Sequence, residues 1–530
     1  MTSYPTVRLC VPVCVRRADE LRAAVARAAT ATEGPDLIEL RMDCLEDEAQ
    51  LERATRELPA IFRERTRPLV LTLRASAQRG ARELSFERRF RFWSENFFTA
   101  GERADYADLE LDMAEHFTAL EERRAAGLID WDGVICSHHD FAGVPADLEN
   151  IFARMLETPA RILKLAFAAR DITDSLPAFQ LLERARDARR EMIAVAMGEA
   201  GLLTRILAPA RGAFLTFGAL AREHSTAPGQ IEARELRTLY RVDLIDEQTE
   251  IFGLAGSPVA HSLSPHMHNA AFAARGLNAV YLPFETRDVR AFVRRMVHPR
   301  TRELVWNLRG LSVTAPHKSD IIPSLDWVEP SAREIGAVNT IVCETDALKG
   351  YNTDAAAVLA PLANLITLGQ ASRVALIGAG GAARAVLWSL REAGARATVF
   401  ARNTGRAGAT AEKFDAHLQA LDGARFDNFD LVINATPLGT RGTRETETPA
   451  LAAQLRGARC AYDLVYNPGE TRFMREARAA NCEIVLGGLP MLVAQAAAQF
   501  KLWTGQDAPL EVMNMEASRQ VSKTRAENEC

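Results

Sequence analysis

Residues 373–402 read RVALIGAGGAARAVLWSLREAGARATVFAR, and this stretch decides the fold of the second half of the chain. A short apolar run leads into Gly378 and Gly380 and then into a helix-like segment, which gives the GxGxxA pattern in a strand–turn–helix context. Glycines in such a turn let the backbone approach a pyrophosphate, and the N-terminus of the helix attracts its negative charge. The stretch therefore predicts a Rossmann lobe that binds a dinucleotide.

The end of the next strand indicates which dinucleotide binds. An acidic residue at this point would accept hydrogen bonds from the ribose of NAD, whereas FARNTGR (400–406) supplies Arg402 and Arg406. Two arginines suit the 2′-phosphate of NADP, so NADP(H) is the predicted cofactor.

Moving towards the N-terminus, the first 240 residues alternate short apolar runs with Arg- and Glu-rich amphipathic stretches. Each run is rich in Val, Ile, Leu or Phe, as buried parallel strands are. The eight runs span residues 7–15, 36–41, 68–74, 106–111, 133–137, 161–167, 192–197 and 213–217. Eight such repeats predict a (βα)8 barrel.

Ionisable residues stand at the ends of most of these strands, where the chemistry of such barrels gathers. They are Glu39, Arg41, Arg74, Glu110, His138, His139, Lys164 and Arg205, followed by the loop 225–230. Lys164 is unusual because the chain has 64 basic residues, of which only six are Lys, and no other Lys precedes residue 318. A Lys kept inside an apolar run indicates an amine that must lose its proton, which Arg cannot do. The alternative is a side chain that merely extends to solvent.

Composition limits the other classes of function. The chain has 530 residues, 48% hydrophobic and 25% charged, with a formal net charge of −5, which excludes a low-complexity protein and offers no basic field to nucleic acid. No run of about 18 apolar residues occurs, so we expect no membrane partner. Eight cysteines without a CxxC pair, and a start unlike a targeting peptide, predict reduced thiols and a cytoplasmic location.

The predicted fold class is α/β: an N-terminal TIM barrel, then a two-lobed unit made of a smaller α/β lobe and the Rossmann lobe. We expect the barrel at 1–240, the smaller lobe at 249–360 completed by 489–515, and the Rossmann lobe at 361–488. Residues 516–530 are expected to form a disordered polar tail.

Motifs in both halves resemble known enzyme families. Residues 5–235 resemble type I 3-dehydroquinate dehydratase through LIELRMD (37–43), SHHDF (137–141), ILKLAFAARDITD (162–174) and APGQ (227–230). Residues 249–515 resemble shikimate dehydrogenase through GSPVAHSLSPHMHN (256–269), SVTAPHK (312–318), GYNTD (350–354) and NATPLG (434–439). The order is that of the plant bifunctional enzymes and of the end of the fungal five-step polypeptide. The resemblance implies dehydration of 3-dehydroquinate to 3-dehydroshikimate, then NADPH-dependent reduction to shikimate, with no metal.

The resemblance also implies roles in the barrel. Lys164 would form a Schiff base with the substrate ketone, His139 would move protons and Glu39 would assist it. Five residues would bind substrate: Arg41, Arg74 and Arg205 as a clamp, and Thr226 and Gln230 from a closing loop. Gln78 stands where the family commonly has Glu, and we expect Gln78→Glu to lower KM.

In the dehydrogenase half, Lys318 and Asp354 would form the catalytic pair. The substrate would be bound by Ser262, Ser264, Thr314, Asn339 and Gln495. The cofactor would be bound by Gly378, Ala379, Gly380, Gly381, Ala382, Arg402, Arg406, Thr436 and Gly488. The Ser262 and Ser264 pair can also be explained as the start of a helix, since Pro265 follows.

Two alternatives remain. The second half could be an NAD-dependent quinate dehydrogenase, although Ser262, Ser264 and Arg402 argue against it. The chain could instead be a metabolite-sensing regulator without catalysis, although the retained Lys164 and Lys318 argue against that.

Overall fold

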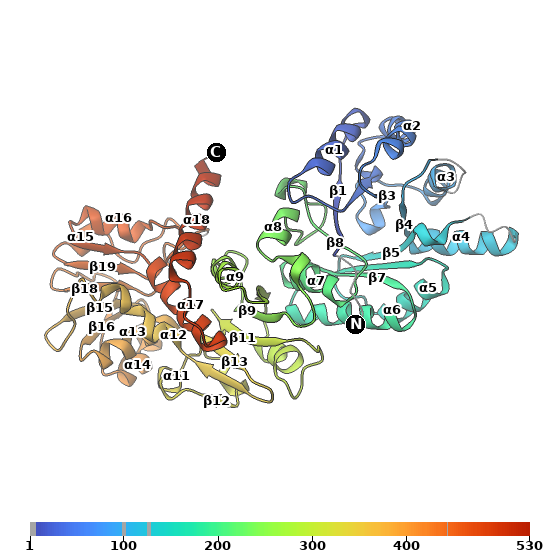
Figure 1. Ribbon diagram of the computed structural model, residues 1–530. Coiled ribbons are helices and arrows are strands. Elements are labelled where there is room, and N and C mark those ends of the chain that lie inside the picture. Colours follow the sequence, from blue (N-terminus) through green and yellow to red (C-terminus); the bar gives the residue numbers. More distant parts are fainter. Residues whose placement is uncertain (1–6, 98–101, 125–128, 443, 530) are drawn as a thin grey trace. The chain divides into compact units, whose positions relative to one another are not determined.

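The computed structural model describes residues 7–97, 102–124, 129–442 and 444–529 (Figure 1). These residues form two compact units, one centred on the barrel and one on two six-stranded sheets, with the short segments 282–288 and 303–307 grouped with the first. Within the described residues, no helix is both long and apolar enough to cross a membrane.

The first unit is the predicted barrel of eight strands. They are β1 (Leu9–Val13), β2 (Leu37–Arg41), β3 (Leu69–Thr72), β4 (Tyr106–Glu110), β5 (Val134–Asp140), β6 (Ile162–Ala168), β7 (Glu191–Met197) and β8 (Thr216–Phe217). The sheet runs in the order β7-β6-β5-β4-β3-β2-β1-β8, and a bridge from Met192 in β7 to Ala213 just before β8 closes the ring. The paired strands of this sheet are parallel, so the carboxyl ends of the strands meet at one mouth.

Helices connect the barrel strands. They are α1 (Ala18–Thr30), α2 (Glu48–Glu64), α3 (Phe86–Asn96), α4 (Leu111–Arg124), α5 (Leu148–Glu157), α6 (Leu176–Asp187), α7 (Leu202–Leu207) and α8 (Ala233–Thr238). Their apolar faces are buried, as Leu51, Leu58 and Phe62 are in α2, because an amphipathic helix must cover the outer face of the strands.

One expectation about the cysteines is wrong. Cys14, just after β1, and Cys44, just after β2, are joined by a disulfide rather than reduced. The parallel pairing of β1 with β2 brings these residues together although 30 positions separate them, so no local pattern could reveal the pair.

The second unit begins with a six-stranded mixed sheet. Its strands are β9 (Glu250–Gly256), β10 (Ala279–Glu285), β11 (Leu308–Val313), β12 (Trp327–Val328), β13 (Thr340–Cys343) and β14 (Leu348–Tyr351), in the order β10-β9-β11-β13-β14-β12. Its helices are α9 (Ser264–Ala274), α10 (Val289–Phe292), α11 (Pro330–Ile335) and α12 (Thr353–Val358). We call this part the substrate lobe.

The second sheet is parallel throughout and has the strand order of a Rossmann fold, β17-β16-β15-β18-β19-β20. Its strands are β15 (Arg373–Ile377), β16 (Arg396–Ala401), β17 (His417–Ala420), β18 (Leu431–Asn434), β19 (Cys460–Asp463) and β20 (Ile484–Leu486). Its helices are α13 (Gly381–Glu392), α14 (Thr404–Lys413), α15 (Ala452–Leu455) and α16 (Arg472–Ala479). The strand–turn–helix predicted from residues 373–402 is confirmed as β15, the glycine turn and α13.

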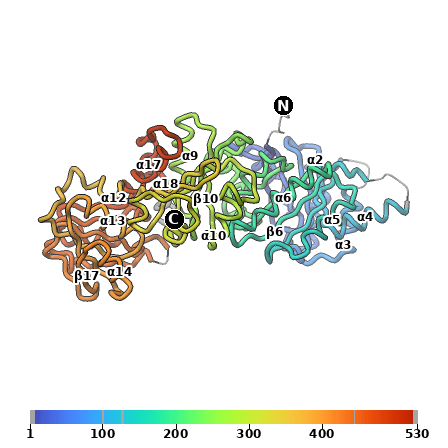
Figure 2. Tube along the Cα trace, turned by 90° about the horizontal axis from the view of Figure 1, so that it is seen from below, coloured from blue at the N-terminus to red at the C-terminus, as the bar shows by residue number. Residues whose placement is uncertain are grey.

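The chain then returns to the substrate lobe through α17 (Leu489–Thr504) and α18 (Leu510–Glu529), which lie beside α9 in both views (Figures 1 and 2). Val493 and Phe500 of α17 and Met513 and Ala517 of α18 join the core around Phe252 and Phe272. The expected disordered tail is therefore wrong: residues 516–529 continue a helix whose first half is anchored by buried side chains.

Candidate active sites

The barrel mouth holds a cavity that encloses about 510 Å³, open solvent at its entrance included. Every substrate-binding and catalytic residue predicted for this half lines it: Glu39, Arg41, Arg74, His139, Lys164, Arg205, Thr226 and Gln230. His138 and Glu110, which also stand at strand ends, are not part of the lining. Phe141, Phe217 and Met197 complete the wall and were not predicted from the sequence.

Lys164 is buried on β6 and is held by carboxylates. Its Nζ lies 2.6 Å from Asp108 Oδ2, 3.8 Å from Glu39 Oε1 and 4.4 Å from the centre of the Phe217 ring. Asp108 is itself buried and also accepts hydrogen bonds from Ser137 Oγ at 2.6 Å and Arg74 Nη2 at 3.1 Å. Although burial opposes ionisation, the cations Lys164 and Arg74 keep the pKa of Asp108 well below its ordinary value.

Asp108 was missed in the sequence. Side chains alternate along a strand, so Asp108 and Glu110 of β4 leave the strand on the same side, and this spacing was the available signal. The position of Asp108 in β4 does not by itself identify its partner, because Lys164 stands 56 residues later.

His139 is buried at the end of β5, beside the cations of the mouth. Burial first, and then Arg74 and Lys164, lowers the pKa of His139 well below its ordinary value, so the imidazole is neutral near pH 7. Gln78 Oε1 accepts the backbone N–H of His139 at 3.0 Å and lies 3.1 Å from Nδ1. An amide oxygen only accepts, so Nδ1 carries the proton and Nε2 has a free lone pair.

Four arginines line the mouth, and the three predicted from the sequence differ in their partners. Arg41 forms a bidentate pair with Asp43, with N–O distances of 3.0 and 2.8 Å, and Arg74 pairs with Asp108. Arg205 is almost fully buried and contacts the carbonyls of Phe217 and Pro228 at 3.4 and 3.3 Å, and no carboxylate in the described residues pairs with it. Burial lowers the pKa of Arg205 to about 10. A buried cation without a counter-ion is costly, which indicates that an anionic ligand completes the site.

The second cavity lies between the substrate lobe and the Rossmann lobe and encloses about 730 Å³, open solvent included. Nine predicted residues line it: Ser262, Ser264, Thr314, Lys318, Asn339, Asp354, Ala382, Gly488 and Gln495. The lining also includes Tyr466 and Gln499, which sequence reasoning missed. Gln499 stands four residues after Gln495 on α17, so helical spacing was the signal that could have found it.

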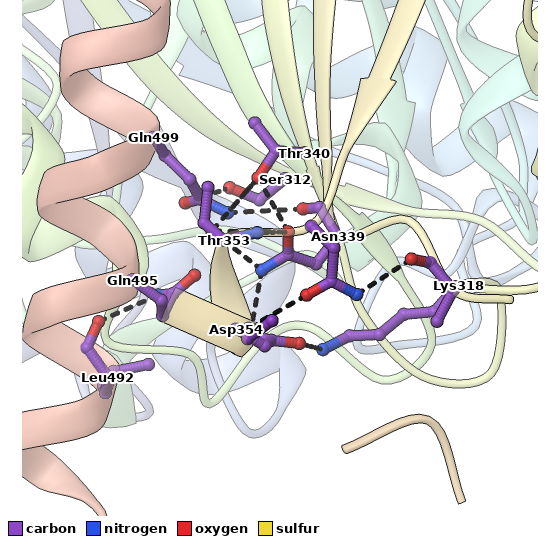
Figure 3. A network of polar contacts seen from close by, with 12 residues as sticks. Ser312, Lys318, Asn339, Thr340, Thr353, Asp354, Leu492, Gln495 and Gln499 are labelled. Carbon is purple, nitrogen blue, oxygen red and sulfur yellow. Dashed lines mark hydrogen bonds and ion pairs between the residues drawn. The ribbon is translucent and has the colours of Figure 1, made fainter. Parts of the chain in front are cut away.

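Lys318 and Asp354 form a close ion pair, with Nζ 2.5 Å from Oδ2 (Figure 3). Asn339 Nδ2 donates to Asp354 Oδ1 at 2.8 Å, and Asn339 Oδ1 accepts the N–H of Thr353 at 2.8 Å. Asp354 is thus fixed from two sides at the start of α12, and it fixes Lys318 in turn. The side chain of Lys318 remains 22% exposed, so its ammonium group faces the cavity rather than the core.

A continuous chain of hydrogen bonds includes three residues that line this cavity, Ser312, Gln499 and Asn339. Tyr281 Oη donates to Ser312 Oγ at 2.7 Å, Ser312 Oγ donates to Gln499 Oε1 at 2.8 Å, and Gln499 Nε2 donates to the carbonyl of Asn339 at 3.2 Å. At the other wall, Ser262 Oγ accepts the N–H of Ser264, the first residue of α9, at 3.2 Å. Both explanations of the Ser pair therefore agree with the geometry, since Ser262 supports the helix start while both serines line the cavity.

The glycine turn after β15 fits a dinucleotide. Gly378 has φ +112°, and a Cβ there would come within 3.1 Å of the Ala435 carbonyl oxygen and of Thr436 Cγ2. A Cβ at Gly380 would meet nothing within 4 Å, so this side of the turn is open. Beyond it, the free N–H groups of α13 point towards the opening. Arg402 and Arg406 are exposed at the end of β16 and the start of α14, as a 2′-phosphate site requires.

Comparison with known proteins identifies the family of each half of the chain. The type I 3-dehydroquinase family matches residues 9–247, the shikimate dehydrogenase substrate binding domain matches 254–341, and the shikimate 5′-dehydrogenase C-terminal domain matches 488–517. The bifunctional 3-dehydroquinate dehydratase/shikimate dehydrogenase of Arabidopsis thaliana, named as chloroplastic, is 33% identical over 527 residues, covering 95% of this chain and 83% of the relative.

Single-function relatives match the second half. The NADP⁺ shikimate dehydrogenase of Moorella thermoacetica is 43% identical over 287 residues, covering 51% of this chain and 93% of the relative. The crystal structure of shikimate 5-dehydrogenase from Thermus thermophilus, in complex with NADP(H) and shikimate, is 38% identical, covers 51% of this chain and 99% of that one, and has a TM-score of 0.46.

A barrel with a buried lysine at its mouth, followed by a dinucleotide-binding dehydrogenase, defines a bifunctional enzyme of the lyase and oxidoreductase classes. The chain belongs to the family of bifunctional 3-dehydroquinate dehydratase/shikimate dehydrogenases. It is thus a type I dehydroquinase joined to an NADP-dependent shikimate dehydrogenase of the shikimate pathway.

Proposed function

We propose that Lys164 and His139 dehydrate 3-dehydroquinate, and that Lys318 and Asp354 then reduce the 3-dehydroshikimate with NADPH. The division of labour follows the domains expected from the sequence: the barrel at 1–240, the substrate lobe at 249–360 with 489–515, and the Rossmann lobe at 361–488. The observation that carries the proposal is the pair of carboxylate-held lysines, one in each cavity.

In the barrel, the ammonium group of Lys164 loses one proton and the resulting free amine attacks the substrate ketone. That proton joins the oxygen that leaves as water, so a protonated imine forms. This cation is the electron sink that acidifies the adjacent C–H bond. Asp108 faces Lys164 Nζ and supplies the negative charge that stabilises the imine cation.

The neutral His139 then takes the α-proton with its free Nε2. The enamine expels the β-hydroxyl, which leaves as water after it receives a proton from the histidine. Hydrolysis of the imine releases 3-dehydroshikimate and restores the Lys164 amine. Arg205, which lacks a carboxylate partner among the described residues, binds the substrate carboxylate. Arg41, Arg74, Thr226 and Gln230 hold the hydroxyl groups, and Glu39 orients Lys164 and His139.

In the dehydrogenase half, NADPH held at the glycine turn would supply a hydride to the ketone carbon. The substrate oxygen becomes an alkoxide and takes a proton from Lys318, whose position Asp354 and Asn339 fix. Ser262 and Ser264 bind the substrate carboxylate, while Thr314, Asn339 and Gln495 bind the ring hydroxyls. The cofactor is held by the turn at 378–382 with Thr436 and Gly488, and Arg402 and Arg406 take its 2′-phosphate.

Two single variants test these roles. We expect Lys164→Ala to slow NADPH consumption from 3-dehydroquinate by about a thousandfold or more. The same variant should still reduce added 3-dehydroshikimate at the wild-type rate. Lys318→Ala should leave dehydration intact and slow the reduction. If Lys164→Ala still dehydrated 3-dehydroquinate at the wild-type rate, the covalent mechanism would be wrong. Oxidation of quinate in preference to shikimate would overturn the assigned substrate.

The cytoplasmic location and the absence of a nucleic-acid partner stay predictions. The Arabidopsis relative is named as chloroplastic, and the Cys14–Cys44 disulfide is uncommon in a reducing compartment.

A further inference from the structure

Arg384 joins the Rossmann lobe to two segments of the substrate lobe. It stands in the first turn of α13, and its Nη2 donates to Ser319 Oγ at 2.6 Å and to the carbonyl oxygen of Gly336 at 3.1 Å. Ser319 Oγ donates to the same carbonyl at 3.0 Å, which closes a three-membered junction. Burial lowers the pKa of Arg384, and its buried Nε has no partner among the described residues. Burying a guanidinium group costs desolvation free energy, so its presence here indicates a role beyond filling space.

Each substrate-lobe segment of this junction leads directly to a proposed active-site residue. Ser319 follows Lys318, and Gly336 stands three residues before Asn339. The carbonyl of Lys318 also accepts the N–H of Val338 at 2.7 Å, so the two segments are bonded to each other. A shift of the junction therefore moves the proton donor and the residue that fixes Asp354 together.

The other end of the junction is the cofactor turn. Arg384 lies three residues after Gly381, the first residue of α13, whose N–H groups face the proposed pyrophosphate site. A Cβ at Gly381 would lie 3.7 Å from Lys318 Cδ, so the start of this helix packs against the stem of the catalytic lysine. This is an ordinary van der Waals distance, so a shift of α13 would also shift the side chain of Lys318.

We propose that Arg384 is a positioning residue that couples occupation of the cofactor site to the alignment of Lys318. The cofactor phosphate binds the N-terminus of α13 and fixes the position of this helix. Through its hydrogen bonds, Arg384 then fixes Ser319 and Gly336, and the substrate binds more tightly. By thermodynamic reciprocity, substrate then strengthens cofactor binding by the same factor. The inference rests on the roles of Lys318 and α13 given under the proposed function.

The same helix offers a matched control. Farther along α13, Trp388 Nε1 donates to Glu334 Oε2 at 3.0 Å, and Arg391 pairs with Glu334 at 2.8 Å. These contacts join α13 to α11 at the surface, two residues before Gly336, and include none of the hydrogen bonds of the junction. Glu334→Ala therefore loosens the same lobe interface while every hydrogen bond among Arg384, Ser319 and Gly336 is kept.

The experiment measures coupling rather than rate. For the full chain and for Arg384→Gln, Arg384→Lys, Ser319→Ala and Glu334→Ala, the Kd of NADPH is determined by titration calorimetry with and without saturating shikimate, a pair that cannot react because both molecules are reduced. We expect shikimate to tighten NADPH binding about tenfold in the wild type, Arg384→Gln to reduce this factor to about one, and Glu334→Ala to keep it. Arg384→Lys and Ser319→Ala should give intermediate factors, because each retains part of the junction.

The outcomes separate the inference from the proposed function. If Arg384 were only a structural tether, Arg384→Gln would raise the cofactor Kd by the same factor with and without shikimate and would preserve the ratio of the two values. That result would overturn the coupling. A wild type that binds NADPH with no change on adding shikimate would also overturn it. A wild type that binds no NADPH would contradict the proposed function itself. Thermal unfolding of each variant without ligands, compared with the wild type, identifies any variant whose ratio reflects a damaged fold.

Discussion

At the scale of single residues, the pKa of His139 sets the pH at which it can act as a base, and Gln78 is the polar group beside its Nδ1. The neutral imidazole is the active form, so dehydration is lost as the pH falls through the pKa of His139, which burial places well below its ordinary value. A carboxylate at position 78 would stabilise the imidazolium and raise that pKa. We expect Gln78→Glu to move the acid limb of the pH profile of kcat/KM for dehydration upwards by about one unit or more.

Gln78→Met is the control for this prediction, because it removes the amide oxygen without adding charge. We expect it to lower kcat, since the tautomer of His139 is no longer fixed, and to leave the acid limb in place. An unchanged acid limb in Gln78→Glu would mean that Gln78 does not contact His139 in solution. The KM from the same measurements tests the lower value expected from the sequence.

Residues with a strong local signal could be predicted, and residues defined by distant partners could not. Lys164 is unusual in an Arg-rich chain and His139 stands at the end of β5, so the sequence alone draws attention to both, whereas Arg205, expected at a strand end, lies in α7 instead. Asp108 acquires its role only when β4 and β6 place it beside Lys164. Likewise, the contact between Gln78 and His139 joins the turn after β3 to strand β5, 61 residues later.

At the scale of elements, α18 is held by few apolar contacts, so each contributes strongly. Met513 is fully buried in the core that α18 shares with α9 and α17, whereas Met515, two residues later, is 66% exposed. We expect Met513→Ala to lower the free energy of unfolding of the second unit by about 2–4 kcal/mol. Met515→Ala is the matched control and should change it by less than about 0.5 kcal/mol. Denaturant unfolding followed by shikimate dehydrogenase activity measures both, and equal effects would mean that α18 does not pack as described.

The same contrast explains which elements could be predicted. Barrel strands are continuous apolar runs, and the glycine turn has a fixed spacing of glycines. Both signals come from neighbouring residues, so both elements can be predicted from the sequence. The segment 516–529 is polar along its length, and its helix depends on the anchor at Met513 and Ala517 just before and within it. The Cys14–Cys44 pair likewise depends on the pairing of β1 with β2.

At the scale of the whole molecule, the two active sites are independent in sequence. The residues that line the barrel cavity run from Glu39 to Gln230, and those that line the second cavity run from Leu254 to Gln499. Neither lining borrows a residue from the other, so each half of the chain carries a complete set of catalytic groups. Fusion therefore places two consecutive reactions on one chain without requiring shared chemistry.

This independence predicts that two inactive chains restore each other. Lys164→Ala alone should consume no NADPH from 3-dehydroquinate, and Lys318→Ala alone should convert that substrate to 3-dehydroshikimate and stop. In an equimolar mixture the released intermediate reaches the intact dehydrogenase of the other chain, so NADPH consumption should return after a lag while 3-dehydroshikimate accumulates to its KM. Adding 3-dehydroshikimate directly should abolish the lag, which is the control. A mixture that stays inactive, although each variant keeps its remaining activity, would mean that the intermediate does not leave the chain that makes it.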